Sequence, residues 1–338
     1  MTDLATVDQT ITPPAPGAVD PAVANLEQYR AELTAYCYRM LGSAFEAEDA
    51  VQETMVRAWR GLDRFEGRAA LRSWLYRIAT NVCLDMLSSR ERRARPMDLG
   101  PALTADDALG PALPDGRWVE PVPDARVLPT GGDPAAVTEL RETIRLAFVA
   151  ALQHLPPRQR AVLILREVLQ WQATEVAELL DTTVASVNSA LQRARATLAA
   201  KELNASDPPP PMDDEQRDLL ARYVEAFEQY DMNKLTALLQ EDATWNMPPY
   251  ELWLQTHEDI VKWCLGPGIG CQGSRLVPTT ANGSPAFGQY KPNPDGEGYV
   301  PWSLQVLELA DGQIRGITFF LDTARMFPLF GLPLTIEA

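Results

Sequence analysis

The sequence predicts a multidomain chain in which two all-α domains precede an α+β domain. Residues 24–95 and 137–200 have the apolar spacing of amphipathic helices, and Pro-rich stretches separate them from their neighbours. From about residue 213, helical segments lead into strand-like runs, which is typical of an α+β domain. With 338 residues, the chain is long enough for two or three domains that each bury a core.

The shifts in composition set the expected domain boundaries. Residues 1–23 are mostly small or polar and include several Pro. They lack the basic and apolar regions of a signal peptide, so we expect a disordered leader. The expected units are a leader at 1–23, a helical domain at 24–95, a linker at 96–136, a second helical domain at 137–202, a Pro-rich linker at 203–212 and an α+β domain at 213–338.

The net charge of −16 is unevenly distributed along the chain. Residues 57–95 hold ten Arg and four acidic residues, and residues 139–201 hold eight basic and six acidic ones. Residues 202–338 hold eight basic and twenty acidic residues. The two helical domains are therefore suited to bind a polyanion, and the acidic C-terminal segment is suited to compete with that polyanion.

The cysteine and histidine content argues against a metal site. The four Cys form no CxxC pair and the chain has two His, so we expect free thiols, no metal and no cofactor. No run of about 18 apolar residues occurs, so we expect no membrane span and a cytoplasmic location.

In the first helical domain, the helix at 46–62 has an apolar and a polar face. The apolar face, expected to be core, consists of Val51, Met55, Ala58 and Trp59. The polar face consists of Glu48, Asp49, Gln52 and Glu53. Such a face is ordinarily just solvated, and the alternative is a docking surface for a basic partner.

The stretch that follows combines aromatic and basic side chains. Aromatic rings stack on unpaired bases, while arginines neutralise phosphates. Trp74, Ile78 and Val82, spaced by four, could equally form a core stripe. The candidate contacts to opened DNA are Arg64, Phe65, Arg68, Arg72, Trp74, Tyr76, Arg77, Asn81, Arg92 and Arg93.

Residues 173–198 predict a helix-turn-helix. We expect Thr174 to cap a helix at 175–180 and Thr183 to cap a second helix at 184–198, about 22 Å long. The apolar contacts between them are expected from Val176, Leu179, Val184, Val187 and Leu191. A helix of this kind fits a major groove, where Asn and Gln read adenine and Arg reads guanine or phosphate. The candidate contacts are Thr183, Ser186, Asn188, Ser189, Gln192, Arg193 and Arg195.

The acidic third predicts helices at 214–231 and 232–239, then strands in ATWNM, YVPWSLQVLELA and QIRGITFFLD. Asp311-Gly312 is expected to form a hairpin turn between the last two strands. The candidates for a core or ligand pocket are Trp245, Trp253, His257, Trp302 and Phe319. His257 could also form an acid–base pair with a nearby carboxylate, although a surface position is the ordinary explanation.

Taken together, the two helical domains resemble the sigma-70 family, specifically the extracytoplasmic-function (ECF) RNA polymerase sigma factors. EDAVQETMVRAW at 48–59 resembles region 2.2, residues 64–87 resemble regions 2.3 and 2.4, and residues 155–198 resemble region 4. The resemblance implies that Glu48, Asp49, Gln52 and Glu53 dock on the β′ clamp helices of core RNA polymerase. It also implies a −10 element melted and read by the first domain, and a −35 element read by the second, which meets the β flap.

The recognition helix departs from the family pattern, since Asn188-Ser189-Ala190 stands where Lys-Ser-Arg is frequent. Two positive charges are therefore missing there. The third domain resembles the SnoaL-like domains, cone-shaped α+β barrels around an apolar pocket, as in ECF factors of the SigG/SigJ type. That resemblance implies control in cis, and leaves open a small-molecule ligand of the barrel.

The sequence therefore predicts a non-enzymatic ECF sigma factor that directs promoter-specific transcription initiation. The alternative is a helix-turn-helix protein fused to a small-molecule-converting or ligand-sensing SnoaL-like enzyme domain. A plain helix-turn-helix repressor is a third option, but it needs neither the aromatic-basic stretch nor the EDAVQE face.

Overall fold

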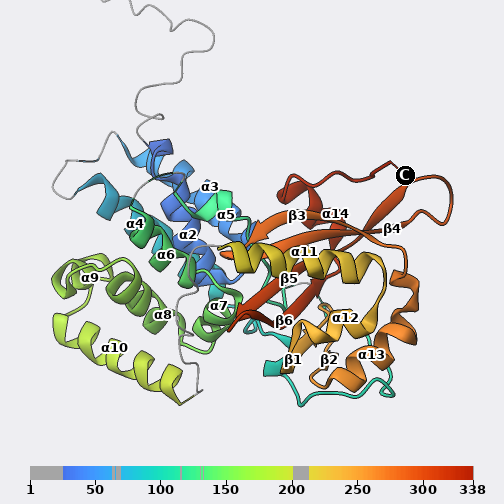
Figure 1. Ribbon diagram of the computed structural model, residues 1–338. Coiled ribbons are helices and arrows are strands. Elements are labelled where there is room, and N and C mark those ends of the chain that lie inside the picture. The colour runs from blue at the N-terminus through green and yellow to red at the C-terminus, as the bar shows by residue number, and fades with distance from the viewer. Residues whose placement is uncertain are drawn as a thin grey trace, which may run out of the picture.

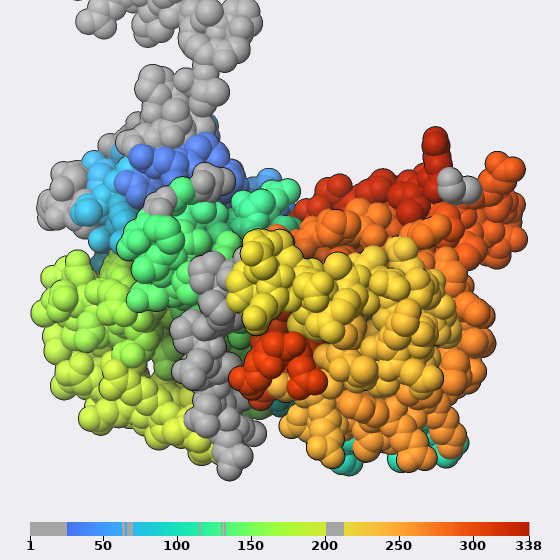
Figure 2. Space-filling model, in the orientation of Figure 1, coloured from blue at the N-terminus to red at the C-terminus, as the bar shows by residue number. Residues whose placement is uncertain are grey.

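The computed structural model describes residues 26–62, 65, 70–114, 116–129, 131, 133–200 and 213–337. Two helical blocks lie beside an α+β domain (Figure 1), and in the space-filling view the three abut on this face (Figure 2). The predicted fold class is confirmed. The expected leader and the Pro-rich linker at 203–212 lie outside the described residues.

The first helical block consists of α2 (Arg30–Leu41), α3 (Ala44–Gly61) and α4 (Leu71–Leu87). Gly42 ends α2 in the left-handed conformation, with φ 71°, and its N–H donates to Tyr38 O at 2.8 Å. Ser43 then caps α3 by accepting from Glu46 N at 3.3 Å. A Cβ at position 42 would lie 3.2 Å from Gln153 Cδ, so the absence of a side chain lets the second block approach this corner.

The second helical block consists of α6 (Pro134–Glu142), α7 (Leu146–Gln153), α8 (Pro157–Leu163), the π-helical turn η3 (Ile164–Val168), α9 (Ala173–Leu179) and α10 (Val184–Ala199). Thr183 caps α10 as predicted, accepting from Ser186 N at 3.1 Å. The prediction that Thr174 caps the preceding helix is wrong. The helix begins two residues earlier than predicted, at Ala173, and Gln172 occupies the cap position while its N–H donates to Glu175 at 2.7 Å.

Two buried arginines cross the interface between the helical blocks in opposite directions. Arg39 of α2 donates to Thr143 O at 3.1 Å, and Arg160 of α8 donates to Met40 O and to Gln153 Oε1. Burial lowers the pKa of each guanidinium to about 10, so both remain charged at neutral pH. Because a buried charge is costly without partners, these hydrogen bonds favour one arrangement of the two blocks.

The linker between the helical blocks is folded. It contains η2 (Pro96–Asp98) and α5 (Asp124–Val127). The chain leaves the first block at Ala94 and returns beside it at Trp118: Ala94 N donates to Arg117 O at 2.9 Å, and Val119 N donates to Ala94 O at 3.1 Å. Between these points, residues 99–114 run beneath the α+β domain, shown in teal in Figure 1.

The α+β domain contains α11 (Asp214–Glu228), α12 (Met232–Ala237), β1 (Leu239–Asn246), β2 (Trp253–Leu254), α13 (His257–Leu265), the 3-10 turn η4 (Pro267–Cys271), β3 (Arg275–Ala281), β4 (Ser284–Pro292), β5 (Tyr299–Ala310), β6 (Gln313–Phe320) and α14 (Thr323–Leu329). The strand order is β2-β1-β6-β5-β4-β3. Asp311 and Gly312 form the predicted hairpin turn, with φ 52° and 72°. The β3–β4 hairpin was not predicted, and the sheet is mixed because β1 and β6 are parallel.

The two faces of this sheet belong to different apolar cores. Helices α11, α12 and α13 cover one face (Figure 1), whose core includes Leu307, Ile317 and Phe319. On the opposite face, Phe327 of α14 packs against Tyr290, with 5.1 Å between ring centroids. That second core is continuous with the helical blocks, so the third domain shares a core with them.

Two expectations concern the chain as a whole. All four cysteines are free thiols, as expected. Among the described residues, no helix is long and apolar enough to cross a membrane.

Candidate functional site

The polar face of α3 is largely open. Asp49, Gln52 and Glu53 are exposed, and Glu53 pairs with Arg57 one turn along at 2.6 Å. Glu48 is half-buried, and its carboxylate lies 2.9 Å from Arg126 of α5. The structure therefore brings all four candidates to one surface, with one of them held by the linker.

Trp59 also lies on this surface, since 57% of it is exposed, and the prediction that it is core is wrong. The ring of Trp74 already covers the end of α3, where a Cβ on Gly61 would meet it at 3.1 Å. Trp59 lies at the edge of the apolar face and remains outside. An exposed Trp is unusual on a purely solvated face, and it adds an apolar element to the polar one.

The candidate contacts to opened DNA are divided in this conformation. Arg64 and Arg68 lie outside the described residues. Phe65 and Trp74 stack with 5.0 Å between ring centroids, and Asn81 is exposed. Phe65 and Trp74 are half-buried and Asn81 is exposed, so these three side chains remain partly or fully open to solvent.

Tyr76 is fully buried between the two helical blocks. Its ring contacts Tyr36 on one side and Trp171 on the other, each at 5.1 Å between centroids. Arg72 lies over the rings of Tyr76 and Trp171 at 5.2 and 5.5 Å. Its guanidinium also pairs with Glu32 at 3.0 Å. Tyr76 therefore has no free face for a base, whereas Arg72 is half-buried and already contacts both rings and Glu32.

Arg77 and Arg92 also make contacts to the second block. Arg77 is exposed and donates to the main-chain carbonyl of Glu178 in α9, while Arg92 contacts the imidazole of His154. The block expected to read the −35 element therefore closes over part of the surface expected to read the −10 element.

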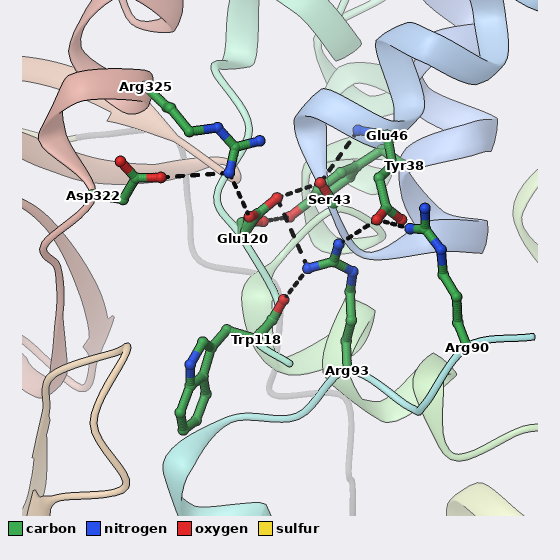
Figure 3. Close-up of polar contacts among 9 residues, drawn as sticks. All are labelled: Tyr38, Ser43, Glu46, Arg90, Arg93, Trp118, Glu120, Asp322 and Arg325. Atoms are coloured by element: carbon green, nitrogen blue, oxygen red, sulfur yellow. Dashed lines mark hydrogen bonds and ion pairs between the residues drawn. The ribbon is translucent and has the colours of Figure 1, made fainter. Parts of the chain in front are cut away.

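Arg93 lies in a buried polar cluster where the first block meets the linker (Figure 3). It is 6% exposed, and it pairs with Glu46 at 2.6 Å and donates to Trp118 O at 2.5 Å. Arg90 contacts the same carboxylate of Glu46. In this conformation Arg93 holds the linker, and a phosphate contact by it stays a prediction.

Glu120 is the linker side of that cluster (Figure 3), and the sequence analysis missed it. Its N–H donates to Gly42 O at 2.9 Å, its carbonyl accepts from Tyr38 Oη at 2.8 Å, and its carboxylate accepts from Ser43. The carboxylate also lies 3.9 Å from Arg325 of α14. Apolar Trp118, Val119 and Val122 within a Pro-rich stretch were the available signal. The cluster borders a cleft of about 610 Å³.

The tip of the β3–β4 hairpin, residues 281–284, joins all three parts of the chain. Asn282 is fully buried: its Oδ1 accepts from Val122 N at 3.0 Å, and its Nδ2 donates to Tyr38 Oη and Ile144 O at 2.6 Å each. Its own N–H donates to Val122 O at 3.0 Å. One side chain thus bonds the first block, the linker and the second block.

The recognition helix α10 is open. The exposed candidates are Ser186, Asn188, Ser189, Gln192, Arg193 and Arg195. Arg195 pairs with Glu167 at 2.6 Å, and the hydroxyl of Thr183 is used in the helix cap. Val184 is 38% exposed, so its predicted packing role is wrong, because the first turn of α10 extends beyond the contact that Val187 and Leu191 make.

The pocket candidates in the third domain occupy different environments. Trp245 and Phe319 are buried and stacked, with 4.5 Å between centroids. Trp253 donates to Gly100 O in the linker, and His257 contacts Gln240 O at 2.8 Å. Trp302 is 39% exposed, and the ammonium group of Lys291 lies over its ring in a cation–π contact.

Comparison with known proteins decides the family. A model of sigma-70 region 2 matches residues 26–93, a model of sigma-70 region 4 matches residues 145–198, and a SnoaL-like domain model matches residues 220–317. The chain is 46% identical over 322 residues to the ECF RNA polymerase sigma factor SigG of Mycobacterium tuberculosis, which covers 92% of this chain and 83% of that protein. The chain belongs to the ECF RNA polymerase sigma factors.

Other members of the family extend the comparison. SigJ of the same organism is 26% identical over 86% of this chain and 89% of its own. SigW of Bacillus subtilis is 33% identical, and the match covers 82% of SigW but only 50% of this chain. The crystal structure of SigJ covers 92% of this chain and 99% of its own, with a TM-score of 0.58 at 22% identity, and supports the shared fold.

Proposed function

We propose that this ECF sigma factor binds core RNA polymerase through α3, reads and melts the −10 element with α4 and its flanking residues, and reads the −35 element with α10. The C-terminal SnoaL-like domain controls this in cis by holding the two sigma blocks closed. The observation that carries the control is the buried Asn282, which bonds both blocks and the linker at once.

The polymerase contact is supported by the state of α3 in the closed arrangement. Asp49, Gln52 and Glu53 are exposed, and Trp59 offers a large apolar group beside them. An interface commonly combines a buried aromatic anchor with a polar rim. We assign the basic β′ clamp helices to this face and the β flap to the second block, so the closed protein can still meet polymerase.

The DNA contacts differ in their availability. The recognition helix α10 presents its polar side chains to solvent, whereas Tyr76 on α4 is covered by Trp171, and the half-buried Arg72 lies against the same ring. A −10 strand therefore cannot stack on Tyr76 until the second block moves away. This favours an order of events in which the protein docks on polymerase before it contacts the −10 element.

A regulatory role for the third domain is supported by its interior. Tyr223, Gln305 and Gln289 form a hydrogen-bonded chain at 2.6 and 3.1 Å on the helix-covered side of the sheet, and all three are fully buried. Burial raises the pKa of Tyr223 well above its ordinary value, so its phenol stays protonated and is not available as a general base. The chain of amides and hydroxyls is suited to holding the fold, and we therefore propose that the protein is not an enzyme.

The docking assignment is tested by reversing charge on α3. Asp49→Arg combined with Glu53→Arg should abolish capture of core polymerase while thermal unfolding changes little, because both side chains are exposed. The matched control is Asp218→Arg with Glu225→Arg on α11, which makes the same charge change on another exposed helix. Equal capture by both double variants would refute the assignment.

Control in cis is tested by run-off transcription with the full chain and with a chain ending at residue 202. A promoter-dependent difference between the two supports the proposal. Identical transcription at every polymerase concentration would remove the third domain from control and make an independent activity of that domain the next question.

A further inference from the structure

The linker segment 99–114, which we call the strap, is docked on one edge of the C-terminal sheet. The sheet ends at β2, a strand of two residues with an outward-facing main chain. Leu103 N donates to Trp253 O at 2.9 Å, and the indole of Trp253 donates back to Gly100 O at 3.0 Å. The strap therefore covers an edge that would otherwise be open to another extended chain.

Further contacts extend this docking along α13 and the β1–β2 turn. Ala105 N donates to Asp259 Oδ1 at 3.0 Å, and Leu113 N donates to Pro249 O at 2.9 Å. Ala105 is buried in the apolar core on this side of the sheet, with Leu103 packed against it. Asp106 pairs with Lys262 on the surface. The docked segment thus combines a main-chain contact to β2 at Leu103 with a turn at residues 104–107, whose Ala105 and Asp106 contact α13.

The strap is part of a loop whose two ends are held together by the bridge between Ala94 and Trp118. Residues between these points add nothing to the reach of the linker, because both ends lie together on the first block. Val122 is fixed by the hairpin tip, and the second block begins at Asp133. The eleven Cα–Cα steps from Val122 to Asp133 span at most about 40 Å.

The distance between the two promoter elements is larger than the span of this closed linker. Two elements named for positions −10 and −35 lie about 25 base pairs apart, roughly 85 Å along B-form DNA. The 38 Cα–Cα steps from Arg95 to Asp133 can span about 125–135 Å when the loop is open. The closed linker therefore reaches less than half the distance, and the open one exceeds it.

We propose that the β2 edge with the start of α13 is a reversible docking site for the chain's own strap, which stores linker length and releases it when both promoter elements are engaged. This rests on the proposed sigma function. The strap contact differs in position and strength from the contact made by the β3–β4 hairpin tip. Asn282 is fully buried, while the strap is held by a few main-chain hydrogen bonds, the small buried side chain of Ala105, the partly buried Leu103 and one exposed ion pair, which contributes little.

The first test is amide hydrogen exchange of the full chain, free and in a complex with core polymerase and promoter DNA. The N–H groups of Leu103, Ala105 and Leu113 should be protected in the free protein and should exchange at least tenfold faster in the complex. The N–H of Val306 in the central strand β5 is the internal control and should stay protected. Unchanged protection of the three strap amides in a transcribing complex would overturn the proposal.

A second test needs no polymerase. In a full-length variant, residues 99–114 are replaced by a Gly-Ser sequence of equal length, and a labelled peptide with the natural strap sequence is added. The peptide should bind the variant and fail to bind the unaltered chain, whose own strap competes at high effective concentration. The control peptide carries Leu103→Asp and should bind at least tenfold more weakly. Equal binding of both peptides, or none by either, would remove the docking site.

These two tests separate the strap from the sigma function. If core polymerase fails to capture the chain, the proposed function is wrong, while the peptide experiment still decides whether the edge is a docking site. If polymerase is captured and transcribes but the strap amides remain protected, the sigma function stands and the strap proposal fails.

Discussion

Tyr76 of the first helical block and Trp171 of the second stand ring to ring, with 5.1 Å between their centroids. Both are buried, and Arg72 lies over the two rings. A base cannot stack on Tyr76 while Trp171 occupies that face. Under the proposed −10 contact by Tyr76, the arrangement of the two helical blocks therefore controls access to that ring.

Removing the second ring should uncover the first. An aromatic pair contributes about 0.5–1.5 kcal/mol beyond its area, so Trp171→Ala should raise the affinity of the free protein for a single-stranded −10 oligonucleotide about 2- to 12-fold. Fluorescence anisotropy with the labelled oligonucleotide measures this. The change should appear without polymerase.

The control for this experiment is Trp171→Phe, which keeps an aromatic ring and should bind the oligonucleotide like the unaltered chain. Circular dichroism must show that the helices of the Ala variant remain. A folded Trp171→Ala protein with unchanged affinity would mean that covering Tyr76 does not limit access to DNA.

Substituting Asn282 tests whether its hydrogen bonds hold the three parts of the chain together. Its φ of 56° is left-handed, a conformation that Asn and Gly adopt more readily than other residues. Asn282→Gly therefore keeps the turn and removes only the side chain, leaving Val122 N and Ile144 O without partners. Each buried unsatisfied group costs about 1–3 kcal/mol, so the closed form should be destabilised by several kcal/mol.

Small-angle scattering should show a larger radius for Asn282→Gly than for the unaltered chain. The control is Asn293→Gly in the exposed β4–β5 turn, which should leave the shape unchanged. An equally compact particle in both variants would argue that the hairpin tip does not hold the blocks together.

Asp124 gives the closed form a dependence on pH. Burial raises the pKa of its carboxyl above 3.8, against the hydrogen bond from Gly283 N and the charge of Arg141. A carboxyl with a raised pKa contributes stability that is fully present below its ordinary pKa and is lost as the pH rises through the raised value. The contact should therefore be weaker at pH 7 than near pH 4.

Asp124→Asn keeps the acceptor oxygen and removes the ionisation. The variant should have a higher thermal midpoint than the unaltered chain at pH 7, and the difference should shrink as the pH falls towards 4. Thermal unfolding between these limits measures it. A lower midpoint at pH 7 would show that attraction by Arg141 outweighs the cost of burying the carboxylate.

The sequence was informative where the pattern is local. Helical periodicity located the two helical blocks, Thr183 was correctly assigned as a helix cap, and Asp311-Gly312 as a hairpin turn. The family followed from residue order within single helices. Each of these features depends on residues a few positions apart.

The contacts between the domains could not be predicted in the same way. Asn282 meets Tyr38 across 244 positions, and nothing near either residue indicates the other. Trp59 and Tyr76 show the same limit, since one was expected in the core and is exposed, while the other was expected to face DNA and is buried. Their environments are set by the packing of α3, α4 and the second block, which periodicity does not describe.

The last prediction concerns α14, which fastens the C-terminal domain to the first helical block. The guanidinium of Arg325 lies 4.1 Å from the ring of Phe45 and 3.9 Å from Glu120. Arg325 is partly exposed, so its cation–π contact and ion pair together contribute roughly 1 kcal/mol. Arg325→Ala should therefore loosen the contact slightly, whereas Arg325→Lys should retain part of it.

Truncation after Asp322 should act far more strongly than either substitution. It also removes Met326, Phe327 and Leu332, which are buried against the sheet, and loss of such side chains costs about 2–5 kcal/mol each. We expect an expanded scattering profile at low and moderate salt and altered promoter-directed transcription, with the helical content of both sigma blocks retained. Charge alone could not keep the truncated form closed, because exposed charges are screened within about 8–10 Å. If the truncated chain stays compact and transcribes like the full chain, α14 is not the fastening, and the hairpin tip alone must hold the domain in place.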